Sequence, residues 1–210
     1  MTSLTPAAGH QLRADAARNR EALLAAATRA FVSSVAEPSM RAIAREAGVG
    51  VATLYRHFPT RESLVDAVYQ DQVKRLTDGA GELLGAHSPA RALRMWMDLF
   101  GDWLATKHGM LGTLVAMIDS GQIAHAETRE QLLAAITTIL EAGRATGDIR
   151  PDVNAEDIAA GLLGIFTVAG ATTQHAQAAR LLDLLLDGLG PRPPPSRLAA
   201  APGLVGGDQG

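Results

Sequence analysis

The chain has 210 residues, of which 47% are hydrophobic, 20% are charged and only 4% are aromatic. This length allows one large or two small domains, and the composition is ordinary for a soluble globular protein. The absence of cysteine excludes disulfides, thiolate metal sites and a cysteine nucleophile. No apolar run reaches about 18 residues, and residues 1–12 lack a signal-peptide pattern. We therefore expect a cytoplasmic protein with no membrane partner.

The net charge of −3 is unevenly distributed along the chain. Residues 1–75 carry ten basic and seven acidic side chains, a net charge of +3, whereas residues 76–210 carry nine basic and fifteen acidic side chains, a net charge of −6. A local basic face can hold phosphates even on an acidic protein. The excess of +3 is modest, so it needs the support of a motif.

Four helices are predicted in the first part of the chain, each bounded by residues that favour a helix start or stop. Pro38 ends the first helix, Ser39 caps the second, Gly48 separates the second from the third, and Thr60 caps the fourth. The predicted ranges are about 15–33, 40–47, 51–58 and 60–84, after a flexible arm at residues 1–12 that shows no periodicity.

The rest of the chain is also predicted to be helical. Pro89 favours a helix start, and Asn154 is expected to cap a helix after a turn. Residues 191–210 are rich in Pro and Gly and are predicted to be a disordered tail. The predicted helices are about 89–107, 110–119, 126–145, 155–170 and 174–189, which makes the fold class all-α with about nine helices.

The most informative segment is Ser39–Leu64. Its apolar positions fit two short helices packed across a tight turn, in which Gly48 permits a backbone conformation that a Cβ resists. The second short helix can then project from the body and enter a major groove of DNA. Its remaining side chains are expected to face outward, toward phosphate oxygens and base edges, and they are Val51, Ala52, Thr53, Tyr55, Arg56 and His57.

This segment resembles the DNA-binding domain of the tetracycline-repressor (TetR) family, whose pattern is approximately T-x-x-x-I-A-x-x-A-G-V-S-x-G-T-L-Y-x-H-F-x-S-K-E-x-L. The match covers about residues 18–70, with Ile43-Ala44, Ala47-Gly48-Val49, Thr53-Leu54-Tyr55, His57-Phe58 and Glu62-x-Leu64 in register. The resemblance implies a helix-turn-helix DNA-binding domain at residues 13–60 and a ligand-binding and dimerisation domain at residues 61–190. It further implies a homodimer that binds a near-palindromic, double-stranded DNA operator, and a small-molecule effector.

The resemblance also implies which residues contact DNA. Phosphate contacts map to Ser39, Tyr55, His57 and Arg61, and base contacts to Val51, Ala52 and Thr53. Arg41 and Arg56 are candidates for guanine or phosphate, and Arg18 and Arg20 for phosphate or the minor groove. A plain surface role for Arg41 and Arg56, and a surface or packing role for His57, stay open.

Two positions depart from the family pattern. Val35 occupies the place of the usual loop glycine, which leaves the path of this loop open. The triplet Gly50-Val51-Ala52 replaces Ser-x-Gly, which removes a hydroxyl from the recognition helix. We therefore expect more reliance on thymine methyl contacts and DNA shape.

Large apolar side chains concentrate in the predicted second domain. Trp96, Phe100 and Trp103 recur at helical spacing, and they fit either a core stripe or the wall of a ligand cavity. The candidate cavity residues, which imply a largely apolar effector, are Trp96, Met97, Phe100, Trp103, Leu104, Met110, Met117 and Phe166. The candidate polar selectors are Arg94, Asp98, His108, Asp119, His125 and Thr167.

The last two predicted helices are very apolar. They can be absorbed by the core of one chain, or they can pair with a second copy as the family resemblance implies. The residues expected at this dimer interface are Ile158, Leu162, Ile165, Leu181, Leu184 and Leu185.

No catalytic or metal-binding motif appears in the sequence. We therefore expect a protein that is not an enzyme and has no cofactor and no metal. Repression with release by the effector is the expected output. A ligand-dependent activator and a DNA-binding protein without a small-molecule ligand are the alternatives.

Overall fold

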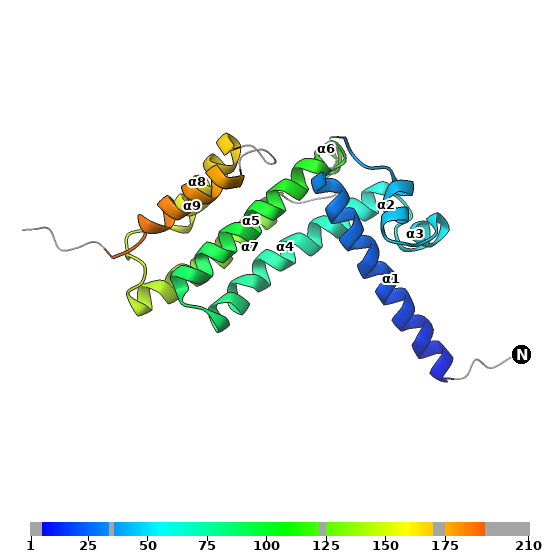
Figure 1. Cartoon of the computed structure of the whole chain (residues 1–210), viewed down its shortest axis with the longest axis horizontal. Helices are drawn as coiled ribbons and strands as arrows, with labels where there is room; N and C mark the ends of the chain where they lie inside the picture. The colour runs from blue at the N-terminus through cyan, green and yellow to red at the C-terminus, as the bar shows by residue number, and fades with distance from the viewer. Residues whose placement is uncertain (1–5, 34–35, 122–124, 170–174, 192–210) are drawn as a thin grey trace, which may run out of the picture.

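The computed structural model describes residues 6–33, 36–121, 125–169 and 175–191. Within these ranges there are nine α-helices and no strand, which confirms the predicted all-α class (Figure 1). The helices are α1 Pro6–Ser33, α2 Met40–Glu46, α3 Val51–His57, α4 Arg61–Ala86, α5 Pro89–Gly109, α6 Leu111–Asp119, α7 His125–Thr146, α8 Ala155–Ala169 and α9 His175–Asp187.

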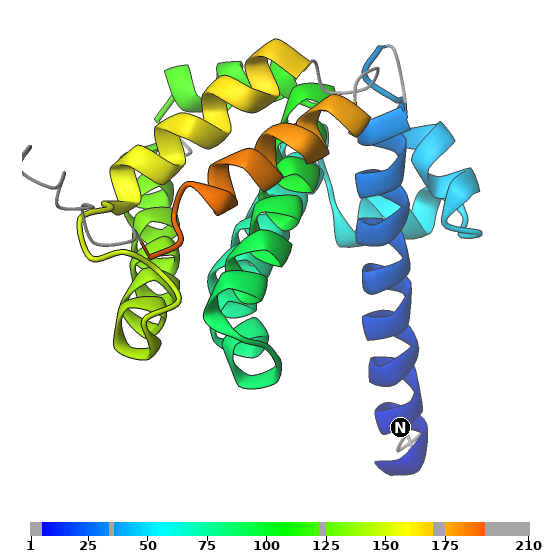
Figure 2. The ribbon, with the colours of Figure 1, turned by 60° about the vertical axis from the view of Figure 1, so that its left-hand side comes forward.

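The start of α1 differs from the prediction. The helix begins at Pro6, so residues 6–12, which were expected to belong to a flexible arm, are helical. Proline is tolerated in the first turn of a helix, and Ala7 and Ala8 then favour its continuation. The N-terminal half of α1 extends beyond the other helices (Figure 2). The remainder of the expected arm, the loop residue Val35, and residues 192–210 of the expected tail lie outside the described residues.

The first three helices form the predicted helix-turn-helix. Ser39 caps α2, because its Oγ accepts a hydrogen bond from the backbone N–H of Ala42 at 3.2 Å. Gly48, between α2 and α3, has a φ of 69°, which a side chain disfavours. Leu54 and Phe58 are buried in the hydrophobic core, so the opposite side of α3 is left at the surface.

Helix α4 connects the helix-turn-helix to the rest of the molecule. Thr60 and Ser63 form a capping box at its start. Further along, α4 packs against α5 and α7, and the indole Nε1 of Trp96 in α5 donates to the carbonyl oxygen of Leu76 in α4 at 2.8 Å. The buried side chains of both parts form one continuous hydrophobic core.

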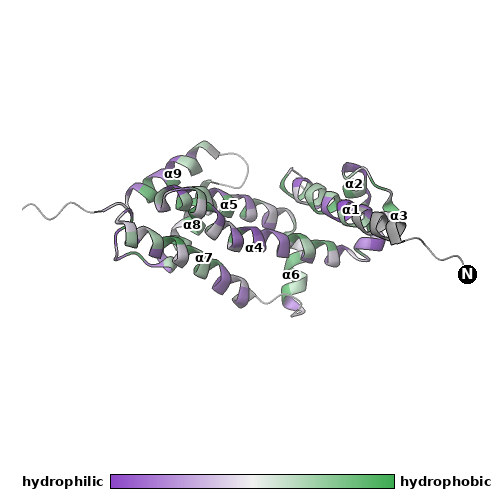
Figure 3. Ribbon diagram, turned by 90° about the horizontal axis from the view of Figure 1, so that it is seen from below, coloured by the Kyte–Doolittle hydropathy of each residue, from purple (hydrophilic) through white to green (hydrophobic). Residues whose placement is uncertain are grey.

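Helices α8 and α9 lie side by side over α5 and α7 at the end opposite to the helix-turn-helix (Figure 1). Helix α6 is short and largely hydrophobic and lies beside α4 (Figure 3). Within the described residues, no helix has both the length and the apolar character that crossing a membrane requires.

Candidate DNA-binding surface and ligand cavity

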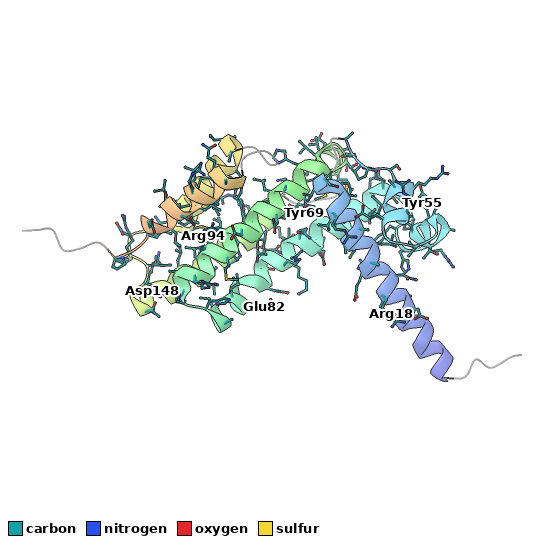
Figure 4. All side chains as sticks on the ribbon, in the orientation of Figure 1. Arg18, Tyr55, Tyr69, Glu82, Arg94 and Asp148 are labelled. Carbon is teal, nitrogen blue, oxygen red and sulfur yellow. The ribbon has the colours of Figure 1, made fainter. Side chains whose placement is uncertain are left out.

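The outer face of α3 presents Ala52, Tyr55 and Arg56 to solvent, with Tyr55 at the outer edge of the domain (Figure 4). Arg56 Nη2 donates to Thr53 Oγ1 at 2.9 Å, so these two candidate DNA contacts support one another. Val51 departs from the expected outward orientation, because it is half-buried and packs against the core. A three-residue spacing places Val51 on the same side of the helix as buried Leu54.

His57 lies at the end of α3. It is half-buried and lines a surface depression together with Arg20, Ser63 and Asp66. The Arg20 guanidinium lies 5.4 Å from the centroid of the Phe58 ring. The remaining candidates Arg18 and Arg41 are exposed, and Arg18 forms an ion pair with Asp15.

Arg61 is directed into the protein, contrary to the expectation that it contacts phosphate. Its Nη2 lies 2.8 Å from Glu37 Oε2, its Nη1 donates to the carbonyl oxygen of Pro38 at 2.6 Å, and its Nε donates to Thr113 Oγ1 at 3.1 Å. The guanidinium also lies 5.9 Å from the centroid of the Phe31 ring. The nitrogens of Arg61 are therefore used within the chain.

Glu37 completes this contact between the helix-turn-helix and α6. Glu37 Oε1 accepts from the backbone N–H of Thr113 at 2.9 Å, and Glu37 Oε2 accepts from Thr113 Oγ1 at 2.9 Å. Partial burial alone would raise the pKa of Glu37, but the hydrogen bonds from Thr113 and Arg61 lower it overall. Sequence reasoning missed Glu37, because its partner Thr113 is far away along the chain.

An apolar cavity of about 400 Å³ opens between α5, α7 and α8. This volume lies within the range of small-molecule sites in proteins. Its lining residues are Phe100, Trp103, Lys107, Thr128, Arg129, Leu132, Leu133, Ile136, Ala159 and Leu163.

Two of the expected cavity residues, Phe100 and Trp103, line this cavity. Four others, Trp96, Met97, Met110 and Met117, are buried in the core and line no described cavity. Trp96 lies one helical turn before Phe100, at a point where α5 packs against α4. There the indole N–H of Trp96 donates to a backbone carbonyl oxygen of α4. Arg94, Asp98, His108, Asp119 and Thr167 are absent from the described lining, and the side chain of His125 lies outside the described residues. The polar residues that line this cavity are Lys107, Thr128 and Arg129.

Leu104 and Phe166 line a different and larger cavity, of about 960 Å³, which is bordered by residues of α1, α2, α4, α5, α8 and α9. Its wall carries both signs of charge, in Arg29, Glu46, Arg75, Asp98 and Asp102. The smaller cavity is therefore the better match to the largely apolar effector that the sequence implies.

The expected dimer residues separate into two groups. Ile158 and Leu162 are 1% and 0% exposed, so they belong to the core of one chain and not to a surface. Ile165, Leu181 and Leu185 are half-buried, whereas Leu184 is 66% exposed. Two residues that were not expected, Leu163 and Val168, are 49% and 72% exposed on α8.

Comparison with known proteins agrees with this arrangement. Residues 23–68 match the family model described as bacterial regulatory proteins, tetR family, and residues 88–191 match the C-terminal domain of SbtR-like transcriptional regulators. A TetR transcriptional regulator from Streptomyces coelicolor is 44% identical, with a TM-score of 0.76, over 82% of this chain and 98% of that chain. A TetR regulatory protein from Mycobacterium vanbaalenii is 35% identical, with a TM-score of 0.67, over 85% of this chain and 99% of that chain.

A helix-turn-helix with an exposed recognition helix, joined to a helical body that contains a cavity, defines a DNA-binding transcription regulator. The chain belongs to the TetR family of these regulators. Members of this family are DNA-binding regulators and not enzymes.

Proposed function

We propose that the protein is a homodimeric repressor that leaves its operator when a small molecule enters the cavity between α5, α7 and α8. The observation that carries this proposal is the solvent-open apolar cavity in a body that shares one continuous core with the helix-turn-helix. A ligand that binds one arrangement of this core more tightly increases the population of that arrangement, and with it one of the positions that the recognition helices can adopt.

The end of α5 supports a route between the cavity and the DNA-binding domain. Trp103 and Lys107 line the cavity in the last two turns of α5. Gly109, the last residue of α5, lies so close to α1 that a Cβ there would be 1.8 Å from the carbonyl oxygen of Phe31. Beyond it, Thr113 of α6 is hydrogen-bonded to Glu37. A ligand that displaces the end of α5 therefore moves two contacts to the helix-turn-helix.

The exposed apolar residues of α8 and α9 support a dimer. Leu163 and Val168 of α8 and Leu184 of α9 are about half to three-quarters exposed, and apolar side chains exposed on two helices that pack together favour association. A second copy related by a two-fold axis would cover them and place two recognition helices for a near-palindromic operator.

The test is a titration of the purified protein against the DNA that flanks its own gene and against random DNA, at two salt concentrations. We expect saturable binding that is at least about 100-fold tighter to the flanking DNA, at the low end of usual specificity ratios. Equal and steeply salt-dependent affinity for both DNAs would contradict a site-specific regulator at this locus.

A further inference from the structure

The polar groups of the α5–α7–α8 cavity supply hydrogen-bond donors and positive charge. Lys107 and Arg129 are cationic, Thr128 carries a hydroxyl, and none of the described residues that line the cavity is acidic. The Tyr69 hydroxyl is hydrogen-bonded to Thr128 Oγ1 at 3.0 Å. A ligand that pairs with these polar groups must accept hydrogen bonds.

The indole of Trp103 and the ammonium of Lys107, which both line the cavity, have no polar acceptor within the described part of the chain. Trp103 is 5% exposed, and its indole Nε1 is buried with no hydrogen-bond partner. Lys107 Nζ lies 5.1 Å from the centroid of the Trp103 ring, a cation–π contact that satisfies none of its N–H groups. Burial lowers the pKa of Lys107, because the ammonium group loses contact with water.

The rest of the cavity lining is suited to a hydrocarbon. It includes Leu132, Leu133 and Ile136 of α7, Phe100 of α5 and Leu163 of α8. Apolar walls with a few placed polar groups hold the body of a ligand by burial and fix its orientation by its head.

We propose that the effector is an apolar carboxylate whose hydrocarbon body lies among α5, α7 and α8 and whose anionic head is bound by Lys107, with Arg129 at the mouth. This inference rests on the proposed function, because it names the ligand class of that same cavity. A carboxylate restores the hydrogen bonds and the counter-charge that the ammonium lacks, and a charge-assisted bond is stronger than a neutral one. An alcohol of the same length can accept a hydrogen bond from the ammonium but brings no counter-charge.

The test uses decanoate and 1-decanol, which share the hydrocarbon body and differ in the head group. The full-length protein is titrated with each by calorimetry. We expect decanoate to bind about 10- to 100-fold more tightly than 1-decanol, because only the carboxylate supplies a counter-charge to the ammonium. Equal affinity for the two probes, or no binding of decanoate, overturns the proposal.

The variant Lys107→Met keeps the length of the side chain and removes its charge. We expect it to weaken decanoate binding by about tenfold or more and 1-decanol binding much less, and retained 1-decanol binding shows that the cavity is intact. The matched control is Lys74→Met, because Lys74 is exposed on α4 and pairs with Asp78 outside the cavity. Decanoate affinity that Lys107→Met leaves unchanged overturns the proposal.

The operator titration without any probe keeps this inference separate from the proposed function. A protein that binds its operator but does not distinguish decanoate from 1-decanol remains a regulator with a different ligand class. If the protein prefers decanoate through Lys107 but does not bind the flanking DNA, the proposed ligand site is supported and the proposed function is contradicted.

Discussion

Glu37 and Arg61 form an ion pair at the junction between the helix-turn-helix and the helical body, with 2.8 Å between Glu37 Oε2 and Arg61 Nη2. Glu37 precedes α2 and Arg61 is the first residue of α4. Because Thr113 of α6 donates to the same carboxylate through its backbone and its hydroxyl, this carboxylate joins three segments.

Removing the charge of Glu37 should lower the stability of the folded protein in a pH-dependent way. We expect Glu37→Gln to cost about 1 kcal/mol at neutral pH, since the pair is partly exposed, and to lower the Tm by about 2–4 °C. The pKa of Glu37 is lowered in the folded state. Its contribution to the free energy of unfolding is therefore present above pH 4.5, the ordinary pKa of glutamate, and is lost as the pH falls through the folded pKa. Thermal unfolding at several pH values measures this, with exposed Glu82→Gln as the control. A difference from the natural protein that grows on acidification would contradict the assignment.

Arg56 tests the recognition helix. We expect Arg56→Ala to lower the affinity for the operator by about tenfold, through the loss of one guanidinium contact. If Arg56 contacts a base, the ratio of the operator affinity to the random-DNA affinity falls in Arg56→Ala. If Arg56 contacts a phosphate, the affinities for both DNAs fall, and the salt dependence of binding decreases by about one ion. Fluorescence anisotropy with both DNAs at several salt concentrations separates these outcomes. Arg91→Ala, which removes an exposed arginine of α5, is the control. Unchanged binding by Arg56→Ala would place Arg56 outside the interface.

Gly109 should tolerate no side chain. A Cβ there would lie 1.8 Å from the carbonyl oxygen of Phe31, which is backbone and cannot rotate away. We expect Gly109→Ala to cost about 3 kcal/mol or more and to lower the Tm by about 6–12 °C. The control is Gly81→Ala in α4, where a Cβ meets nothing within 4 Å and should be neutral or stabilising by up to about 1 kcal/mol. Equal melting temperatures for the two variants would show that the α1–α5 contact is not rigid.

Val168 tests the proposed dimer interface. It is 72% exposed on α8, so a charge there is harmless to a single chain but not to a buried interface. We expect Val168→Asp to shift the protein from dimer to monomer in light scattering after gel filtration, with unchanged helix content. Val115→Asp changes a 45% exposed valine of α6 and should leave the dimer intact. Dimers that survive Val168→Asp would place the interface elsewhere.

The sequence was sufficient for features that depend on neighbouring residues. Ser39 and Thr60 mark helix starts by their ability to cap, and Gly48 marks the turn by its freedom at positive φ. These signals, together with the pattern in Ser39–Leu64, predicted nine helices, their approximate bounds and the DNA-binding domain. Caps and turns depend on residues that are close together in the sequence, so they can be predicted without knowledge of the tertiary contacts.

Tertiary packing alone decided which face of each helix meets which neighbour. Trp96 and Trp103 lie on one face of α5, yet α4 accepts the indole of Trp96, whereas Trp103 borders the cavity. Arg61, which was expected at the DNA surface, forms an ion pair with Glu37. Ile158 and Leu162, which were expected at the dimer surface, are buried in the core. Lys107 and Thr128 acquire their place in the cavity only because α5 and α7 pack together. Helical periodicity specifies a face, but the residues that cover it come from distant parts of the chain, so their identity is fixed only in the folded protein.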